Sequence, residues 1–172
     1  MSRITVDDLA AAIRKVRAMS VKEKEAFAEE IHLHQPHLLA SCLVQSRLGV
    51  EQAAVEFLLN ILLVCYQSMK ESGLQWSEVT EDEQERQMQR LIGAVQFSEH
   101  AAGSVADGAR EQYPSQHPEQ PLLAFVLSET DQWLGAISER NAEAESDKFV
   151  MMASMNLVNC IAGAPVSSAV HV

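Results

Sequence analysis

Residues 50–73 read VEQAAVEFLLNILLVCYQSMKESG and set the architecture of the whole chain. Drawn as a helix, this segment is apolar on most sides, and its polar side chains follow one narrow stripe made of Gln52, Glu56, Asn60, Gln67 and Glu71. A helix with so little polar surface is surrounded by other helices. The pattern therefore predicts a central helix from about Val50 to Ser72, ended by Gly73, with Glu56 and Asn60 at the surface.

Residues 1–19 are expected to form a basic amphipathic helix. Thr5 is a typical N-cap, and the acidic first turn and basic last turn that follow it match the helix dipole. The apolar face is narrow and consists of Val6, Leu9, Ile13 and Val16. Residues 1–24 carry a net charge of +3, which leaves −14 on the remainder of a chain whose total is −11. We therefore expect residues 1–19 to dock on the acidic body of this chain or of a second copy, and to be displaceable by a partner.

Capping and stop signals place two more helices before the central one. Ser20 and Glu23 form a capping box that opens the second helix. Pro36 ends that helix and suits the first position of the third, where a backbone N–H is not needed. Gly49 ends the third helix. The expected core residues of these two helices are Phe27, Ile31, Leu39, Cys42 and Leu43.

Three further helices are expected in the C-terminal half. Thr80 begins a capping box, and the helix that it opens is expected to continue to about Gln112. Residues 113–121 contain three prolines and are expected to form a loop. A sixth helix follows, Ser146 suits the cap of a seventh, and Gly163 ends the seventh. The expected core residues are Met88, Leu91, Ile92, Val95, Leu122, Val126, Trp133, Leu134, Ile137, Phe149, Met151, Met152, Met155, Leu157, Val158, Cys160 and Ile161.

The chain as a whole reads as one all-α domain over residues 1–172, a bundle of about six or seven helices without alternating strand patterns. Its three cysteines, Cys42, Cys65 and Cys160, are far apart and lie in apolar patterns, which favours buried thiols in a reducing compartment. The N-terminus has no apolar secretory segment, and the apolar stretch at 53–66 is short for a bilayer span. We therefore expect a cytoplasmic protein with no membrane partner.

One segment resembles the packing skeleton of a helix-turn-helix motif, with apolar residues spaced around a glycine turn. The residues are Val44, Leu48, Gly49, Val50, Val55 and Leu58. A recognition helix needs cationic and hydrogen-bonding side chains for phosphates and base edges. No Lys or Arg occurs between Arg47 and Lys70, and the segment offers Glu51 and Glu56 instead. The sequence therefore predicts a helix corner in a bundle and no nucleic-acid partner.

Three histidines, His32, His34 and His37, are the candidate metal ligands of this chain. In a helix, His32 and His34 would point about 200° apart, so a shared ion requires an extended backbone before Pro36. The alternative is three exposed histidines at a helix corner. Glu29 and His32 also match half of the ligand set of a di-iron bundle, but no second E-x-x-H pair occurs in the sequence.

Several catalytic signatures are absent, among them G-x-S-x-G, the phosphate-binding G-x-x-x-x-G-K and H-E-x-x-H. No catalytic residue and no cofactor are therefore assigned. We expect a non-catalytic protein that acts through protein–protein interaction, with a second copy in a homodimer as one such partner. The first alternative is a bundle that binds a divalent metal or a small ligand at the His32–His37 corner. The second is an enzyme of a type that the sequence does not reveal.

Overall fold

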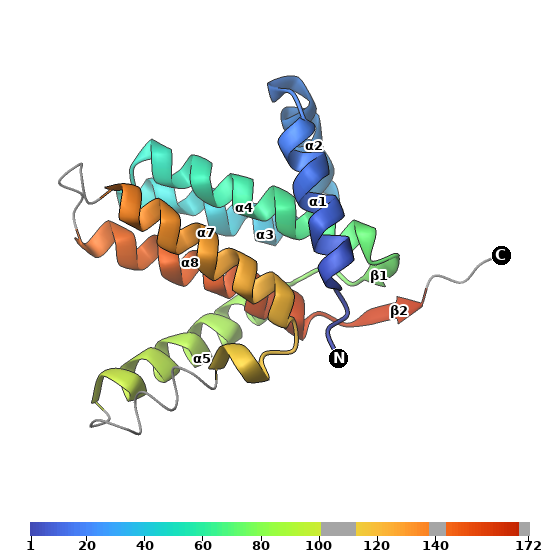
Figure 1. The fold of residues 1–172 in the computed structure, drawn as a ribbon. Helices are drawn as coiled ribbons and strands as arrows, with labels where there is room; N and C mark the ends of the chain where they lie inside the picture. Colours follow the sequence, from blue (N-terminus) through green and yellow to red (C-terminus); the bar gives the residue numbers. More distant parts are fainter. Residues whose placement is uncertain (101–112, 138–143, 169–172) are drawn as a thin grey trace.

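Helix α4, Gln52–Glu71, is the element around which α1, α2, α3 and α8 pack in the computed structural model (Figure 1). The model describes residues 1–100, 113–137 and 144–168, and within these the chain forms seven α-helices of eight or more residues, one 3-10 helix and a short helical turn at residues 113–116, in a single helical body. Every residue from Ile61 to Met69 is buried. The predicted all-α class and central helix are thus confirmed. Glu56 and Asn60 are exposed as expected, whereas Gln67 of the same stripe is buried.

The two N-terminal helices begin where the capping signals predicted. Helix α1 spans Val6–Ala18 and helix α2 spans Val21–His34, and both have complete capping boxes, at Thr5 and at Ser20. The predicted apolar face of α1 was wrong at Val6, whose side chain is 66% exposed. The buried face is centred on Leu9, Ala12 and Val16, and Val6 falls about 60° to one side of Leu9. Ile4, which precedes the helix, is fully buried in its place.

Helix α3, Pro36–Leu43, and the 3-10 helix η1, Val44–Leu48, form the corner before α4. Pro36 stands in the first turn of α3, as predicted. Gly49 ends η1 in the left-handed region at φ 83°, which a residue with a Cβ rarely adopts. The helix buries Leu38 and Cys42, four residues apart on one face, so the expectation that Leu43 is buried was wrong.

A two-stranded antiparallel ribbon, β1 at Leu74–Trp76 and β2 at Val166–Ser168, joins the ends of α4 and α8. The sequence analysis expected no strand. Three residues are too few for an alternating pattern to be recognised. Gly73, at φ 66°, turns the chain from α4 into β1.

The remaining helices are α5, Glu81–His100; α7, Gln120–Ile137; and α8, Ala144–Gly163. Helices α7 and α8 are antiparallel neighbours, and α5 packs on α8 (Figure 1). The predicted loop at 113–121 was wrong at both ends: residues 113–116 are helical, and Pro121 lies in the first turn of α7, where its missing N–H is not needed. Helix α8 begins two residues before Ser146. The expected extension of α5 to Gln112 lies outside the described residues.

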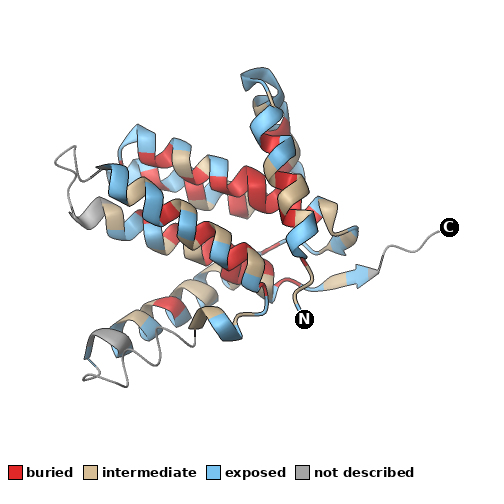
Figure 2. Cartoon of the chain, viewed as in Figure 1, coloured by how far each residue is buried: buried red, intermediate tan, exposed pale blue. Residues whose placement is uncertain are grey.

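The predicted core of these three helices is confirmed at Leu91, Leu122, Val126, Leu157, Val158, Cys160 and Ile161. Phe149 and Met151, also expected in the core, are 45% and 41% exposed. Buried residues lie mainly where α1, α4, α7 and α8 meet (Figure 2). Helix α4, with 20 residues, extends beyond the apolar stretch at 53–66 at both ends and is long and apolar enough to cross a membrane by length and composition. Because 67% of its most apolar stretch is buried within the protein, its apolar surface is used by the fold.

Candidate functional site

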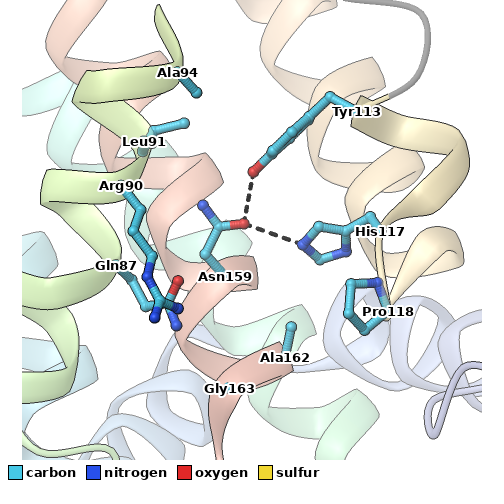
Figure 3. A pocket seen from close by; sticks show the side chains of 10 residues that line it. All are labelled: Gln87, Arg90, Leu91, Ala94, Tyr113, His117, Pro118, Asn159, Ala162 and Gly163. Atoms are coloured by element: carbon cyan, nitrogen blue, oxygen red, sulfur yellow. Dashed lines mark hydrogen bonds between the residues drawn. The ribbon is translucent and has the colours of Figure 1, made fainter. Parts of the chain in front are cut away.

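A cavity of about 370 Å³ opens between α5, the residues just before α7, and the end of α8 (Figure 3). Helix α5 contributes Gln87, Arg90, Leu91 and Ala94; the segment before α7 contributes Tyr113, His117 and Pro118; and α8 contributes Asn159, Ala162 and Gly163. This volume is at the lower end of the range for small-molecule sites. The cavity therefore suits a compact ligand.

Helical spacing explains why these side chains share one space. The four residues of α5 follow the i, i+3, i+4, i+7 pattern of a single helix face, and the three of α8 follow i, i+3, i+4. Gly163 lets the two helices approach closely, because a Cβ at this position would lie 2.7 Å from Glu83 Oε1 and 2.9 Å from Gln87 Nε2. The absence of a side chain at Gly163 therefore leaves room for the side chains of Glu83 and Gln87 beside the cavity.

Hydrogen bonds fix the polar wall of the cavity. His117 Nδ1 accepts the backbone N–H of Glu119 at 3.1 Å, so the ring proton of the neutral imidazole is on Nε2. That Nε2–H donates to Asn159 Oδ1 at 3.1 Å, and the Tyr113 hydroxyl donates to the same oxygen at 2.8 Å. A donor on His117 requires an acceptor on Asn159, which assigns the carbonyl end of the amide to the network.

The other end of that amide has no partner among the described residues. Asn159 Nδ2 makes no hydrogen bond with any of the described residues, although the residue is only 8% exposed. Figure 3 shows the nitrogen directed away from Tyr113 and His117, towards α5. Among the described residues, the fully enclosed side-chain polar atoms without a partner are Gln45 Oε1 and Asn156 Oδ1, whereas the Asn159 nitrogen is accessible and can donate to a ligand in the cavity.

Charges around the cavity are few and mostly neutralised. Arg90 is exposed at the rim and forms no ion pair with another described residue. The described residues that line the cavity include no carboxylate. Glu83, behind Gly163, is paired with Arg86 and accepts a hydrogen bond from Gln87. Burial raises the pKa of Tyr113, which keeps its hydroxyl protonated and able to donate to Asn159.

Hydrogen bonds from Arg3 connect the N-terminal residues to the end of α8, next to the cavity. Arg3 donates to the carbonyls of Ile161, Ala162 and Ala164 at 2.7–2.9 Å and so caps the end of α8. Its Nε lies 2.7 Å from Glu119 Oε1, and the carboxylate of Glu119, fully buried, also accepts the N–H of Ile4. Glu119 therefore links the N-terminal residues to the polar wall. Its carboxylate binds Arg3 and the N–H of Ile4, and its backbone N–H orients His117.

The three candidate metal ligands lie elsewhere, at the corner between α2 and α3. His34 Nδ1 is 2.9 Å from the carbonyl of Glu30, and His37 Nε2 is 3.5 Å from Glu78 Oε1. His32 is exposed. Among all described residues, no group of three or more His, Cys, Asp or Glu side chains is arranged to hold a metal ion.

A second cavity of about 370 Å³ adjoins His34, between the α2–α3 corner, α4 and β1. Its buried polar groups already have partners. Gln35 bonds the carbonyl of Ser77 and the N–H of Val79, and the Trp76 indole N–H donates to Met69 O and Ser72 Oγ. This contrast favours the cavity at Asn159 as the candidate site.

No polar residue of this site was predicted from the sequence. One signal was available: Asn159 interrupts the apolar run Leu157, Val158, Cys160, Ile161 on the buried side of α8. Comparison of the chain with protein-family models, with curated proteins and with solved structures finds no match, so the proposals below rest on this chain's own residues.

Proposed function

We propose that this protein is a non-catalytic binding protein that takes up a small polar molecule in the cavity between α5, Tyr113–Pro118 and α8. One observation carries this proposal: the amide nitrogen of Asn159, a residue that is only 8% exposed and lines the cavity, is a donor for which no described residue supplies an acceptor. The ligand completes the hydrogen bonding that the fold leaves open.

The occupied state of the other polar groups supports binding over catalysis. Both ring nitrogens of His117 are engaged, one by Glu119 N–H and the other by Asn159. The Tyr113 proton is donated to the same amide, and burial raises the pKa of that phenol. A general acid or base must be able to reach the substrate's proton, and here each such proton is held within the wall.

The test is thermal unfolding of the full chain with a set of small polar molecules at millimolar concentration. A ligand at 100 times its Kd adds about 2.7 kcal/mol, a rise in Tm of roughly 5–10 °C for a chain of this length. Ala94→Phe, which fills the cavity, is expected to remove the rise. Ala53→Phe, at an exposed site of α4 outside the cavity, is the matched control. An equal rise in all three proteins would refute the proposal.

A second candidate is the protein–protein interaction expected from the sequence. The observation that favours it is a run of large apolar side chains at the corner of α3 and η1, where Leu43, Val44 and Leu48 are 46%, 41% and 57% exposed. Exposed apolar side chains that cluster in this way mark contact surfaces. We propose that a second copy of the chain covers this corner.

Sedimentation velocity over a range of concentrations tests the second candidate. The native chain is expected to show a concentration-dependent dimer, and Leu43→Glu with Leu48→Glu is expected to be monomeric throughout. A native chain that stays monomeric at the highest concentration, or a variant that dimerises equally well, would contradict it.

A further inference from the structure

We infer that the ligand of this cavity is a small carboxylate with a compact apolar body. The inference rests on the proposed binding function and names its substrate class. It starts from the direction of the Asn159 amide. Because Glu119 N–H occupies His117 Nδ1, the histidine must donate through Nε2, and the group that Asn159 turns towards the cavity is its NH₂. The wall therefore offers a fixed donor and calls for an acceptor on the ligand.

The positive charge of Arg90, at the rim of the cavity, determines which kind of acceptor the ligand carries. Arg90 lines the same cavity from α5, forms no ion pair with another described residue, and lies across the space from Asn159 (Figure 3). A guanidinium presents paired N–H groups whose geometry matches the two oxygens of a carboxylate. A neutral carbonyl would satisfy Asn159 but would gain no charge–charge attraction to Arg90.

The two carboxylates near the cavity in the described part of the chain, Glu83 and Glu119, do not oppose such a ligand. Glu83 is paired with Arg86, and Glu119 is paired with Arg3. Arg3 also covers the carbonyls at the negative end of α8. The net charge of −11 acts from farther away, where salt at physiological concentration screens it over about 8 Å. The local donors therefore outweigh the distant field.

The remaining wall is apolar and small. Leu91 and Ala94 from α5, Pro118 before α7 and Ala162 of α8 line the space next to the two donors. This surface suits a short hydrocarbon or a single ring attached to the carboxylate. A highly charged or extended ligand would lack partners there.

Isothermal titration calorimetry of the full chain with benzoate, benzamide and benzylamine tests the inference, because the three probes share one ring and carry a negative, zero and positive charge. We expect benzoate to bind, benzamide to bind at least about tenfold more weakly, and benzylamine not to bind. Benzamide binding as tight as benzoate would overturn the carboxylate inference and leave the binding proposal standing. If none of the three binds while other small molecules raise the Tm as described above, the inference alone fails.

Variants assign the affinity to the named groups. Arg90→Gln is expected to weaken benzoate about tenfold or more and to leave benzamide unchanged. Arg47→Gln removes one exposed charge outside the cavity and should change neither. Asn159→Asp keeps the oxygen that accepts from Tyr113 and His117 but replaces the donor with a carboxylate oxygen, so it should abolish benzoate binding. If that variant does not fold, the Arg90 comparison stands alone, and equal benzoate affinity in Arg90→Gln and the native chain would overturn the inference.

Discussion

Arg3 connects parts of the molecule that are far apart in the sequence. Its guanidinium pairs with Glu119 before α7, donates to three carbonyls at the end of α8, and lies 4.6 Å from the ring centre of Trp76 in β1. The partner carboxylate is fully buried. An ion pair of this kind matters chiefly because a lone buried charge is costly when one partner is removed.

Arg3→Gln is therefore expected to lower the free energy of unfolding by about 3 kcal/mol. Urea denaturation followed by circular dichroism measures this change. Lys15→Gln is the control, since the Lys15 side chain is 57% exposed and its ion pair with Glu71 should be worth less than about 1 kcal/mol. Adding Glu119→Gln to Arg3→Gln should restore part of the loss, because no charge is then left buried. If Arg3→Gln lowered the free energy of unfolding no more than Lys15→Gln does, the contacts of Arg3 with Glu119 and the end of α8 would not be a major source of stability.

The three buried thiols make stability fall at alkaline pH. Burial raises the pKa of Cys42 and of Cys160 to about 12, and raises that of Cys65 further still. An unfolded thiol ionises near pH 8.5. The stabilisation is thus complete below that pH and is lost as pH rises towards the folded pKa, by about 1.4 kcal/mol per pH unit for each thiol.

Between pH 9 and 10 the free energy of unfolding should fall by about 4 kcal/mol per pH unit for three thiols. Urea titrations at several pH values measure the slope. Cys65→Ala should remove about a third of it, whatever its effect on stability at pH 7. A flat profile over this range would show that the thiols ionise within the folded protein.

At the scale of single elements, two glycines with positive φ, Gly49 and Gly73, end helices, and others lie inside helices. Gly49 has φ 83°, whereas Gly93 lies within α5 with no atom within 4 Å of the position of a Cβ. Gly49→Ala is expected to lower stability by about 1 kcal/mol through backbone strain. Gly93→Ala should raise it by up to about 1 kcal/mol through helix propensity. Thermal unfolding of both variants checks the opposite signs, and a shift in the same direction would contradict the assigned backbone at Gly49.

The starts and ends of most helices could be predicted from the sequence because caps and stops are local signals. Thr5, Ser20, Pro36, Gly49 and Gly73 each act within a few residues, and each does what its chemistry indicates. The phase of a short apolar face is less certain. In α1 and α3 the apolar pattern was compatible with two adjacent faces of the helix. Tertiary packing buries Ile4 instead of Val6, and Leu38 instead of Leu43.

The candidate site could not be predicted in this way. Asn159 meets Tyr113 and His117 across 46 and 42 residues of sequence, so no local pattern links them. The histidines that are close in sequence, His32, His34 and His37, attracted attention because proximity in sequence can be read directly. Nothing local shows that His117 is oriented by a backbone N–H or that Gly163 opens the space beside it.

At the scale of the whole molecule, charge holds α1 to the body only in part. Lys15 lies 2.6 Å from Glu71 of α4 and Arg17 lies 4.0 Å from Glu129 of α7, and both basic side chains are more than half exposed. Each such pair is worth up to about 1 kcal/mol at low salt. The rest of the stabilisation of α1 comes from its buried side chains, Leu9, Ala12 and Val16, and from the bond of Arg3 to Glu119.

Hydrogen exchange at low and high salt measures the share that charge contributes. Amide protection in α1 should fall by up to about tenfold at 1 M salt, while protection in α4 stays constant. Arg3→Gln should lower α1 protection at both salt concentrations. Equal protection of α1 and α4 that does not respond to salt would mean that α1 is simply part of the core, with no tendency to be displaced.

The account of the cavity depends on one atom, the amide nitrogen of Asn159, receiving an acceptor from a bound carboxylate. Two-dimensional ¹H–¹⁵N spectra of the full chain during a benzoate titration observe that group itself. The side-chain NH₂ signals of Asn159 should shift progressively and saturate, while those of Asn60 and Asn156, which lie outside the cavity, stay in place. Saturating benzoate that leaves the Asn159 signals unmoved, or moves all three asparagines alike, would contradict it.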